Sequence, residues 1–268
     1  MAELSAVVSV SVVIPCYRCK GSIARAVESV FAQTLRPAEV ILVDDCSPDD
    51  TLEQLHAEAK RYPPGWVKVI ALKKNGGPGN ARNAGWAEAT GKYVAFLDSD
   101  DSWHIKKTEL QYQWLEQHPE VDLLGQHFAA GQRSELSIDD VRFIPVTGRQ
   151  LLLSNRFSTS SVMIRQDVKY RFKQGMRYCE DYQLWCDICF GGGACFNVDY
   201  PLVNTFKPVY GDSGLSGQLW RMERGELAVH LSLLKRRYIG LPACLLAVSW
   251  SLGKFVRRVI NSSVRRTL

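Results

Sequence analysis

The sequence lacks any uncharged apolar run long enough to cross a bilayer. The longest, from Ile239 to Gly253, falls short of the roughly 20 residues that a spanning helix needs. The apolar stretch from Val7 to Ile14 has no basic leader and runs into Pro15, so it indicates a buried strand and not a secretory signal. Internal repeats and low-complexity segments are also absent. We therefore expect a folded cytoplasmic protein with a sizeable core.

The eight cysteines do not form a recognisable disulfide or zinc framework. Cys16/Cys19 and Cys186/Cys189 have two residues between them, which is the spacing of paired zinc ligands. However, Cys16 ends an apolar strand, and Cys186 and Cys189 lie in an apolar, helix-like run. We therefore interpret them as reduced, mostly buried thiols.

Positive charge is concentrated near the end of the sequence, although the net charge is only +5. A basic end favours an anionic surface, either membrane lipid or nucleic acid, and the sequence shows no nucleic-acid recognition fold. Leu241 to Arg266 alternates apolar residues and arginines with helical spacing, which suits a helix in a membrane interface or a helix packed on the core. The basic residues are Lys235, Arg236, Arg237, Lys254, Arg257, Arg258, Arg265 and Arg266.

Strand and helix signals alternate through the first half. Such alternation with short connections predicts a parallel sheet with helices on both faces. Ser22 is expected to cap the first helix, Thr51 to begin the second, and Asn80 to begin the third. The expected strands are Val10 to Ile14, Val40 to Val43, Trp66 to Leu72 and Tyr93 to Leu97.

The second half is less regular. A helix is expected over Lys106 to His118 and another from about Glu180. From Gly217 onward the pattern is helical, with a break at Gly240-Leu241-Pro242. The expected strands are Ser160 to Arg165, Ala194 to Val198 and Val203 to Phe206.

Acidic residues follow two of the predicted strands, at the sheet edge where parallel sheets bind ligands. The run Asp98-Ser99-Asp100-Asp101 offers hard oxygen ligands that suit Mg²⁺ or Mn²⁺ bridged to phosphates. Asp44-Asp45 could accept hydrogen bonds from a base or from ribose hydroxyls. Alternatively, both groups are solvated turns that cap the helices following them.

Two further segments carry candidate chemistry. Gly76 to Asn83 is a glycine-rich loop before a helix, where Arg82 could bind a diphosphate or lie on a solvated face. Glu180-Asp181 begins an apolar helix, which suits either a general base near a desolvated pocket or carboxylates that favour the helix dipole.

Together these segments resemble the inverting glycosyltransferase family 2, which has the GT-A fold. That fold is an α/β architecture with a Rossmann-like, mostly parallel sheet flanked by helices, to which a helical C-terminal extension would be added here. The likeness is dense from about Val7 to Lys107 and resumes from about Ser158 to Trp185. The matching segments are Val10 to Tyr17, Val40 to Asp49, Asn75 to Gly77, Ala81 to Asn83, Tyr93 to Asp101, and Glu180-Asp181.

The resemblance implies a nucleotide-binding role for five residues. Pro15 and Tyr17 would lie beside the donor's base, and Asp45 would hydrogen-bond that base. Arg82 would approach the base or the diphosphate, and Asp98 would touch the ribose.

The resemblance also implies the catalytic residues. Asp100 would ligate Mn²⁺ or Mg²⁺, Asp181 would be the catalytic base, and Glu180 would support it. Trp185, one helical turn after Asp181, is expected either as an acceptor-sugar platform or as a buried core residue. The implied reaction is a single displacement that inverts the anomeric carbon.

The implied partners are a nucleotide-sugar donor, with UDP as the default base, and a saccharide acceptor. Bacterial surface-polysaccharide enzymes of this family suggest a lipid-linked acceptor and a peripheral position on the inner face of the membrane. Residues 1–125 would form the nucleotide-sugar-binding half, 126–216 the acceptor-binding and catalytic half, and 217–268 a basic helical extension.

Two alternatives and one departure qualify this interpretation. A sugar nucleotidyltransferase would carry a glycine-rich loop after the first strand, where Cys16 to Gly21 stands instead. A catalytically inactive nucleotide- or sugar-binding protein is disfavoured by the intact Asp98, Asp100 and Asp181. The family often carries an arginine, a histidine and serines after the base, whereas Phe206 to Ser216 offers Lys207 and no histidine.

Overall fold

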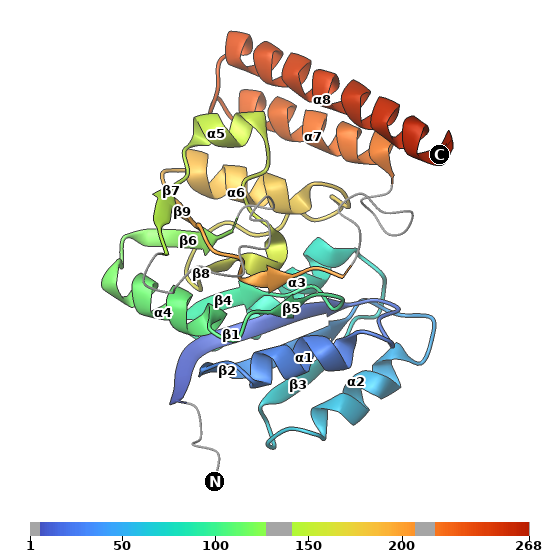
Figure 1. The fold of residues 1–268 in the computed structure, drawn as a ribbon, viewed down its shortest axis with the longest axis vertical. Coiled ribbons are helices and arrows are strands. Elements are labelled where there is room, and N and C mark those ends of the chain that lie inside the picture. The colour runs from blue at the N-terminus through green and yellow to red at the C-terminus, as the bar shows by residue number, and fades with distance from the viewer. Residues whose placement is uncertain (1–5, 127–140, 207–217, 268) are drawn as a thin grey trace.

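The computed structural model describes residues 6–126, 141–206 and 218–267, with the side chains of the last helix described up to Ile260. Within these ranges one mixed sheet has the strand order β3-β2-β1-β4-β8-β6-β9-β7, and a second sheet pairs β10 with β5 (Figure 1). This arrangement is the expected α/β fold with C-terminal helices.

The first half is built as the sequence predicts. Strands β3, β2, β1 and β4 are all parallel, in that spatial order. One departure is local: the hydroxyl of Ser22 donates to the Cys19 carbonyl and does not cap the helix. The elements are β1 (Ala6–Cys16), α1 (Ile23–Phe31), β2 (Leu35–Asp44), α2 (Thr51–Ala59), β3 (Val67–Ala71), α3 (Pro78–Ala87) and β4 (Tyr93–Phe96).

The second half contains short elements that the sequence does not predict, namely β5, β6, β7 and α5. The expected strand over Ser160 to Arg165 is divided into a 3-10 turn (Thr159–Ser161) and β8, and β8 runs antiparallel to β4 and β6. The elements are β5 (Ser102–Trp103), α4 (Lys107–Gln117), β6 (Val121–Gly125), β7 (Phe143–Pro145), α5 (Gly148–Leu153), β8 (Met163–Arg165), α6 (Glu180–Phe190), β9 (Ala194–Val198), β10 (Val203–Asn204), α7 (Leu219–Lys235) and α8 (Leu241–Thr267).

The hydrophobic core lies on both faces of the main sheet. One cluster packs α1 and α2 against the sheet through residues such as Ile23 and Leu55. The other packs α3 and α6, with Trp86 and Trp185 fully buried. Helix α7 lies on α6, and α8 lies on α7 and α5 at the far end of the molecule (Figure 1). No helix in the described part of the chain is long and apolar enough to cross a membrane.

Helix α3 approaches the sheet closely at Gly85. A Cβ atom at this position would lie 2.4 Å from Val13 Cγ1 and 3.1 Å from Val43 Cγ2, both on buried strands. Short β-branched side chains in a close-packed core cannot move away easily.

We therefore expect Gly85→Ala to destabilise the protein by about 1–3 kcal/mol through overpacking. Gly253→Ala is the matched control, because nothing lies within 4 Å of its Cβ position on helix α8. This control should be neutral or stabilising by up to about 1 kcal/mol. Urea unfolding midpoints measure both, and equal midpoints would show that α3 does not approach the sheet this closely.

Candidate active site

The acidic strand ends meet at one edge of the sheet. Because β2, β1 and β4 are parallel neighbours, the residues after Cys16, Asp44 and Phe96 emerge side by side. The Asp45 amide donates to the Cys16 carbonyl at 2.9 Å, which joins the turns after β1 and β2. The edge at which parallel sheets bind ligands therefore carries the predicted carboxylates.

Asp45 holds the glycine-rich loop in place. Its two carboxylate oxygens accept the Gly76 and Gly77 amides, each at 2.8 Å. Gly77 has a φ of 86°, which glycine adopts without steric cost. Burial raises the pKa of Asp45, although the two amides oppose that shift. Each oxygen keeps a second lone pair, so contact with a base remains chemically available.

Left-handed backbone gathers at this edge. Arg18, Cys46 and Cys179 have φ values of 50°, 56° and 57°, and they follow β1, follow β2 and precede α6. Each such residue costs on the order of 1 kcal/mol. The Arg18 amide donates to the Ser47 hydroxyl at 3.2 Å, which holds the first of these turns. Backbone strain of this kind clusters at functional sites.

The Arg82 guanidinium lies at the centre of the site. One of its terminal nitrogens contacts Asp98 Oδ1 at 2.6 Å and the other contacts Glu180 Oε1 at 3.0 Å. The side chain is only 5% exposed, so the pair with Glu180 is almost fully desolvated. Burial opposes the charged form, but the charges of Asp98 and Glu180 outweigh it and the pKa of Arg82 is raised. Arg82 therefore joins two predicted site residues that are 82 positions apart in the numbering.

Glu180 has the most perturbed carboxyl group of this cluster. Burial and the adjacent Asp181 charge raise its pKa to about 7. The contact with Arg82 opposes this shift without cancelling it, because desolvation by burial is the larger effect. Glu180 is therefore poised to change protonation near neutral pH.

Asp181 is oriented by two polar side chains from a preceding segment. Its Oδ2 accepts from Thr159 Oγ1 at 3.0 Å and from Asn155 Nδ2 at 3.3 Å. Its Oδ1 accepts from the Tyr182 amide at 2.7 Å. The carboxylate is half-buried, so one side of it remains accessible to a reacting hydroxyl.

The acidic run after β4 is anchored from two directions. Ser160 Oγ accepts the Asp98 amide at 3.2 Å and donates to Asp101 Oδ2 at 2.5 Å. Arg25 donates to the Asp100 carbonyl at 2.6 Å and lies 3.6 Å from the Phe206 ring centre. These contacts fix the backbone that carries the Asp98 and Asp100 carboxylates.

The residues present fit a divalent cation that is bound together with a diphosphate. Asp98 and Asp100 are only half-buried and offer the oxygen donors that Mg²⁺ and Mn²⁺ prefer. No group of three or more metal-ligating side chains occurs among the described residues. A cation that takes one or two carboxylates and completes its shell with substrate phosphates and water does not need such a group.

The other predicted contacts divide into two outcomes. Pro15 and Tyr17 lie at the end of β1 beside this edge, with Tyr17 44% exposed, and their contact with a base stays a prediction. Trp185 is 0% exposed and packs against Phe157 and Phe172, so the acceptor-platform prediction is wrong and the core alternative holds. The predicted Lys207 contact lies outside the described residues.

Sequence reasoning missed four residues that hold the site: Arg25, Asn155, Thr159 and Arg177. Arg177 donates to Asn75 Oδ1 at 2.7 Å, and its charge acts on Asp45. None of them stands in a motif, and their partners are distant in sequence. Thr159 and Arg177 lie within the stretch from about Ser158 to Trp185 where the family resemblance resumes, and this was the only local signal for them.

The cysteines lie mostly in the core. All eight are free thiols and six are buried. Cys16, the last residue of β1, lies in one hydrophobic cluster, and Cys186, on α6, lies in the other. The two cysteine pairs with zinc-like spacing therefore belong to different hydrophobic clusters.

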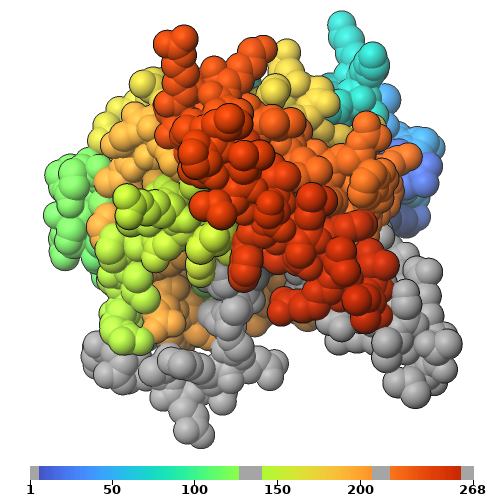
Figure 2. Space-filling model, turned by 90° about the horizontal axis from the view of Figure 1, so that it is seen from above, coloured from blue at the N-terminus to red at the C-terminus, as the bar shows by residue number. Residues whose placement is uncertain are grey.

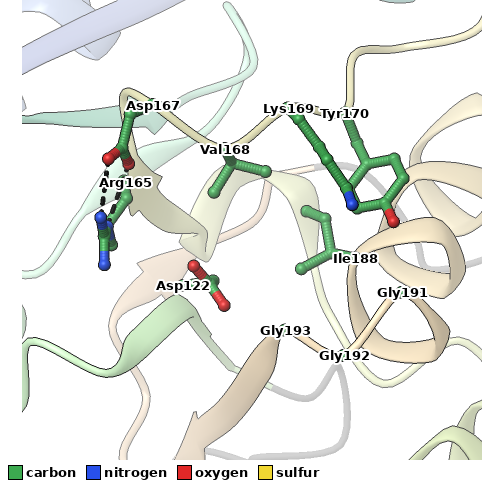
Figure 3. A pocket seen from close by; sticks show the side chains of 10 residues that line it. All are labelled: Asp122, Arg165, Asp167, Val168, Lys169, Tyr170, Ile188, Gly191, Gly192 and Gly193. Carbon is green, nitrogen blue, oxygen red and sulfur yellow. Dashed lines mark hydrogen bonds and ion pairs between the residues drawn. The ribbon is translucent and has the colours of Figure 1, made fainter.

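A separate pocket of about 270 Å³ opens at the opposite edge of the sheet (Figure 3). It lies between Asp122, the segment Arg165 to Tyr170 and the turn Gly191 to Gly193. Arg165 pairs in register with Tyr93, the first residue of β4, so this edge holds the amino ends of the parallel strands. The pocket is therefore distinct from the carboxylate cluster.

Comparison with known proteins identifies relatives over most of the chain. The model of the family described as "Glycosyl transferase family 2" matches residues 11–172. Succinoglycan biosynthesis protein ExoO of Rhizobium meliloti is 30% identical over 216 residues, covering 69% of this chain and 57% of ExoO. The glucosyltransferase WfaP of Escherichia coli is 30% identical over 211 residues, covering 76% of this chain and 78% of WfaP. The chain thus spans little more than half of ExoO.

A solved structure supports the fold. S. aureus TarS 1-349 superposes with a TM-score of 0.66 at 20% identity, covering 91% of this chain and 70% of that one. At this identity the likeness supports the architecture and not the chemistry.

The raised pKa of Glu180 predicts a pH-dependent stability. The folded protein holds a proton that the unfolded chain releases at its ordinary pKa of 4.5, so stability falls as pH rises from about 4.5 to about 7. Glu180→Gln lacks this titration. The free energy of unfolding of the wild type should therefore drop by roughly 1–3 kcal/mol relative to the variant between pH 5 and 8.

Urea unfolding in chelator across this range provides the measurement. Glu116→Gln is the control, because its contact with Lys92 lowers the pKa of Glu116 and gives no such loss. Parallel wild-type and Glu180→Gln curves would show that Glu180 is ionised throughout.

Proposed function

The chain belongs to glycosyltransferase family 2, and from this premise we propose that it transfers a sugar from a nucleotide-diphosphate donor to a hydroxyl of a saccharide acceptor with inversion. Asp181 acts as the base. Asp45 and Asp98 bind the nucleoside, with Pro15 and Tyr17 beside the base.

The contact of Arg82 with both Asp98 and Glu180 is the observation that carries this proposal. It brings the first turn of α6 next to the acidic run that follows β4. A donor held by Asp98 would therefore present its sugar near Asp181. The orientation of Asp181 by Thr159 and Asn155 supports its role as a fixed proton acceptor.

The proposed reaction is one displacement. The acceptor oxygen attacks the anomeric carbon as its proton passes to Asp181, and the bond to the diphosphate oxygen breaks on the opposite face. Mn²⁺ or Mg²⁺, held by Asp100, would when bound neutralise charge on the departing diphosphate. Arg82 is occupied by two carboxylates, so we assign it to positioning and not to direct diphosphate binding.

The relatives suggest the substrates. WfaP is named for transfer of glucose from UDP-Glc to alpha-D-GlcNAc-diphosphoundecaprenol. By similarity we propose a UDP-sugar donor and a lipid-linked saccharide acceptor in surface-polysaccharide assembly. Such an acceptor lies in a membrane, so we place the enzyme in the cytoplasm, peripheral on the inner face of the membrane.

Nucleotide binding is the first test. Isothermal titration with UDP, GDP and dTDP, each with Mn²⁺ and with chelator, should show metal-dependent binding of UDP. Asp100→Ala should weaken that binding by tenfold or more, because the variant removes the protein's proposed metal ligand. Asp122→Asn, at the opposite edge of the sheet, should bind like the wild type. If no nucleotide binds, the chain would be better interpreted as an inactive relative with the same fold.

Asp181→Asn separates catalysis from binding. It should lower turnover of UDP-glucose with GlcNAc-diphosphoundecaprenol by about 10²-fold or more, because the amide cannot accept the proton. Nucleotide affinity should stay within a factor of about two. Asp167→Asn is the control, since that exposed carboxylate pairs with Arg165 at the opposite edge of the sheet. Retained turnover in Asp181→Asn would assign the base elsewhere.

A further inference from the structure

The α7–α8 pair encloses charged contacts beside its buried apolar residues, and it also exposes large apolar side chains. Between the helices, Glu223 is fully buried and accepts from Ser251 at 2.8 Å and from Arg258 at 3.1 Å. Glu226 contacts Lys254 at 2.5 Å and Arg258 at 3.4 Å. A helix on the outside of a water-soluble protein normally shows the reverse arrangement.

The outward face of α8 is apolar over five turns. Leu245 and Leu246 are 58% and 73% exposed, so they make few contacts with the rest of the chain. Figure 2 shows α8 lying in full view across the face seen from above. We call this surface the α8 face, and its exposed apolar residues are Leu241, Leu245, Leu246, Trp250, Leu252, Val256, Val259 and Ile260.

The charges around the α8 face are positive. Residues 217–268 contain ten Lys and Arg residues but only two acidic ones. Those two, Glu223 and Glu226, are turned toward α8 and are already paired. Arg257 is exposed on α8 itself, and Arg237 is exposed at the turn before it. Two copies of this surface would repel each other, whereas an anionic surface would attract it.

We propose that the α8 face is an interfacial docking surface for an anionic lipid bilayer. The helix lies in the plane of the membrane with Leu245, Leu246 and Val256 among the acyl chains, while Arg257 contacts lipid headgroups. Trp250, at the edge of the face, occupies the headgroup level, where tryptophan is enriched.

This inference deepens the proposed function and depends on it for its biological meaning. Helix α7 separates α8 from α6, and the Cys179 thiol, next to Glu180, donates to the Met222 carbonyl of α7 at 3.4 Å. Docking through the α8 face would thus hold the catalytic helix one helix layer from the bilayer, within reach of a saccharide that projects from a lipid.

Flotation of the full chain with vesicles tests the proposal. The wild type should float with vesicles that contain phosphatidylglycerol and much less with phosphatidylcholine alone. Leu245→Gln/Leu246→Gln should reduce flotation by tenfold or more, because the apolar contacts are lost. The control Val7→Gln/Ile105→Gln changes two exposed apolar residues away from α8 and should float like the wild type.

The outcomes separate the alternatives. If the wild type does not float, or if the Leu245→Gln/Leu246→Gln variant floats equally well, the proposal is wrong. A wild-type dimer that this variant converts to a monomer, without flotation, would overturn it in favour of self-association. UDP titration of the same variant reports on the proposed function independently: normal binding with lost flotation supports both proposals, whereas absent UDP binding in the wild type refutes only the proposed function.

Discussion

The buried side chain of Arg82 joins two halves of the site that the chain builds separately. Asp98 belongs to the run after β4, in the parallel part of the sheet, and Glu180 begins a helix that packs beyond the antiparallel strand β8. A guanidinium is suited to this task because it stays charged when buried and presents donors on two sides. Breaking such a contact leaves an uncompensated buried charge, which typically costs about 3–5 kcal/mol. The geometry of the site and the stability of the fold are therefore coupled at this residue.

The neighbouring carboxylates acquire different properties from this arrangement. Glu180 faces inward to Arg82, and burial raises its pKa to about 7. Asp181 faces the other way, toward Thr159 and Asn155, and remains half-buried. Adjacent residues at a helix start diverge in direction by about 100°, so one can serve the interior while the other serves a substrate. This division agrees with Asp181 as the proposed base and Glu180 as its support.

Features with a local sequence pattern were predicted correctly, whereas features that depend on contacts between distant segments of the chain were not. The first four strands and three helices have local patterns, and the rule for parallel sheets then placed Asp45 and Asp98 at one edge without any coordinates. The strand predicted over Ser160 to Arg165 contains β8, but its antiparallel direction was not recognisable, because a run of three residues carries no signal of strand direction. The partners of Arg82 and Asp181 depend on packing between segments far apart in the chain. The prediction of Trp185 as an acceptor platform failed for a related reason. Helical spacing places a residue on one face of a helix but does not say whether other elements cover that face.

The same limit applies to α8, where the sequence pattern identified an amphipathic helix but not the direction of its faces. Buried ion pairs are weak contributors to stability, since apolar residues of similar volume often do as well or better. Glu223, Glu226, Lys254 and Arg258 between α7 and α8 are therefore poorly explained by stability alone. Their position between the two helices is explained if α8 must present its apolar residues on its outer face. With the charged contacts inside, the helix can hold its apolar face outward in a fixed orientation, which is what a surface that binds a bilayer requires.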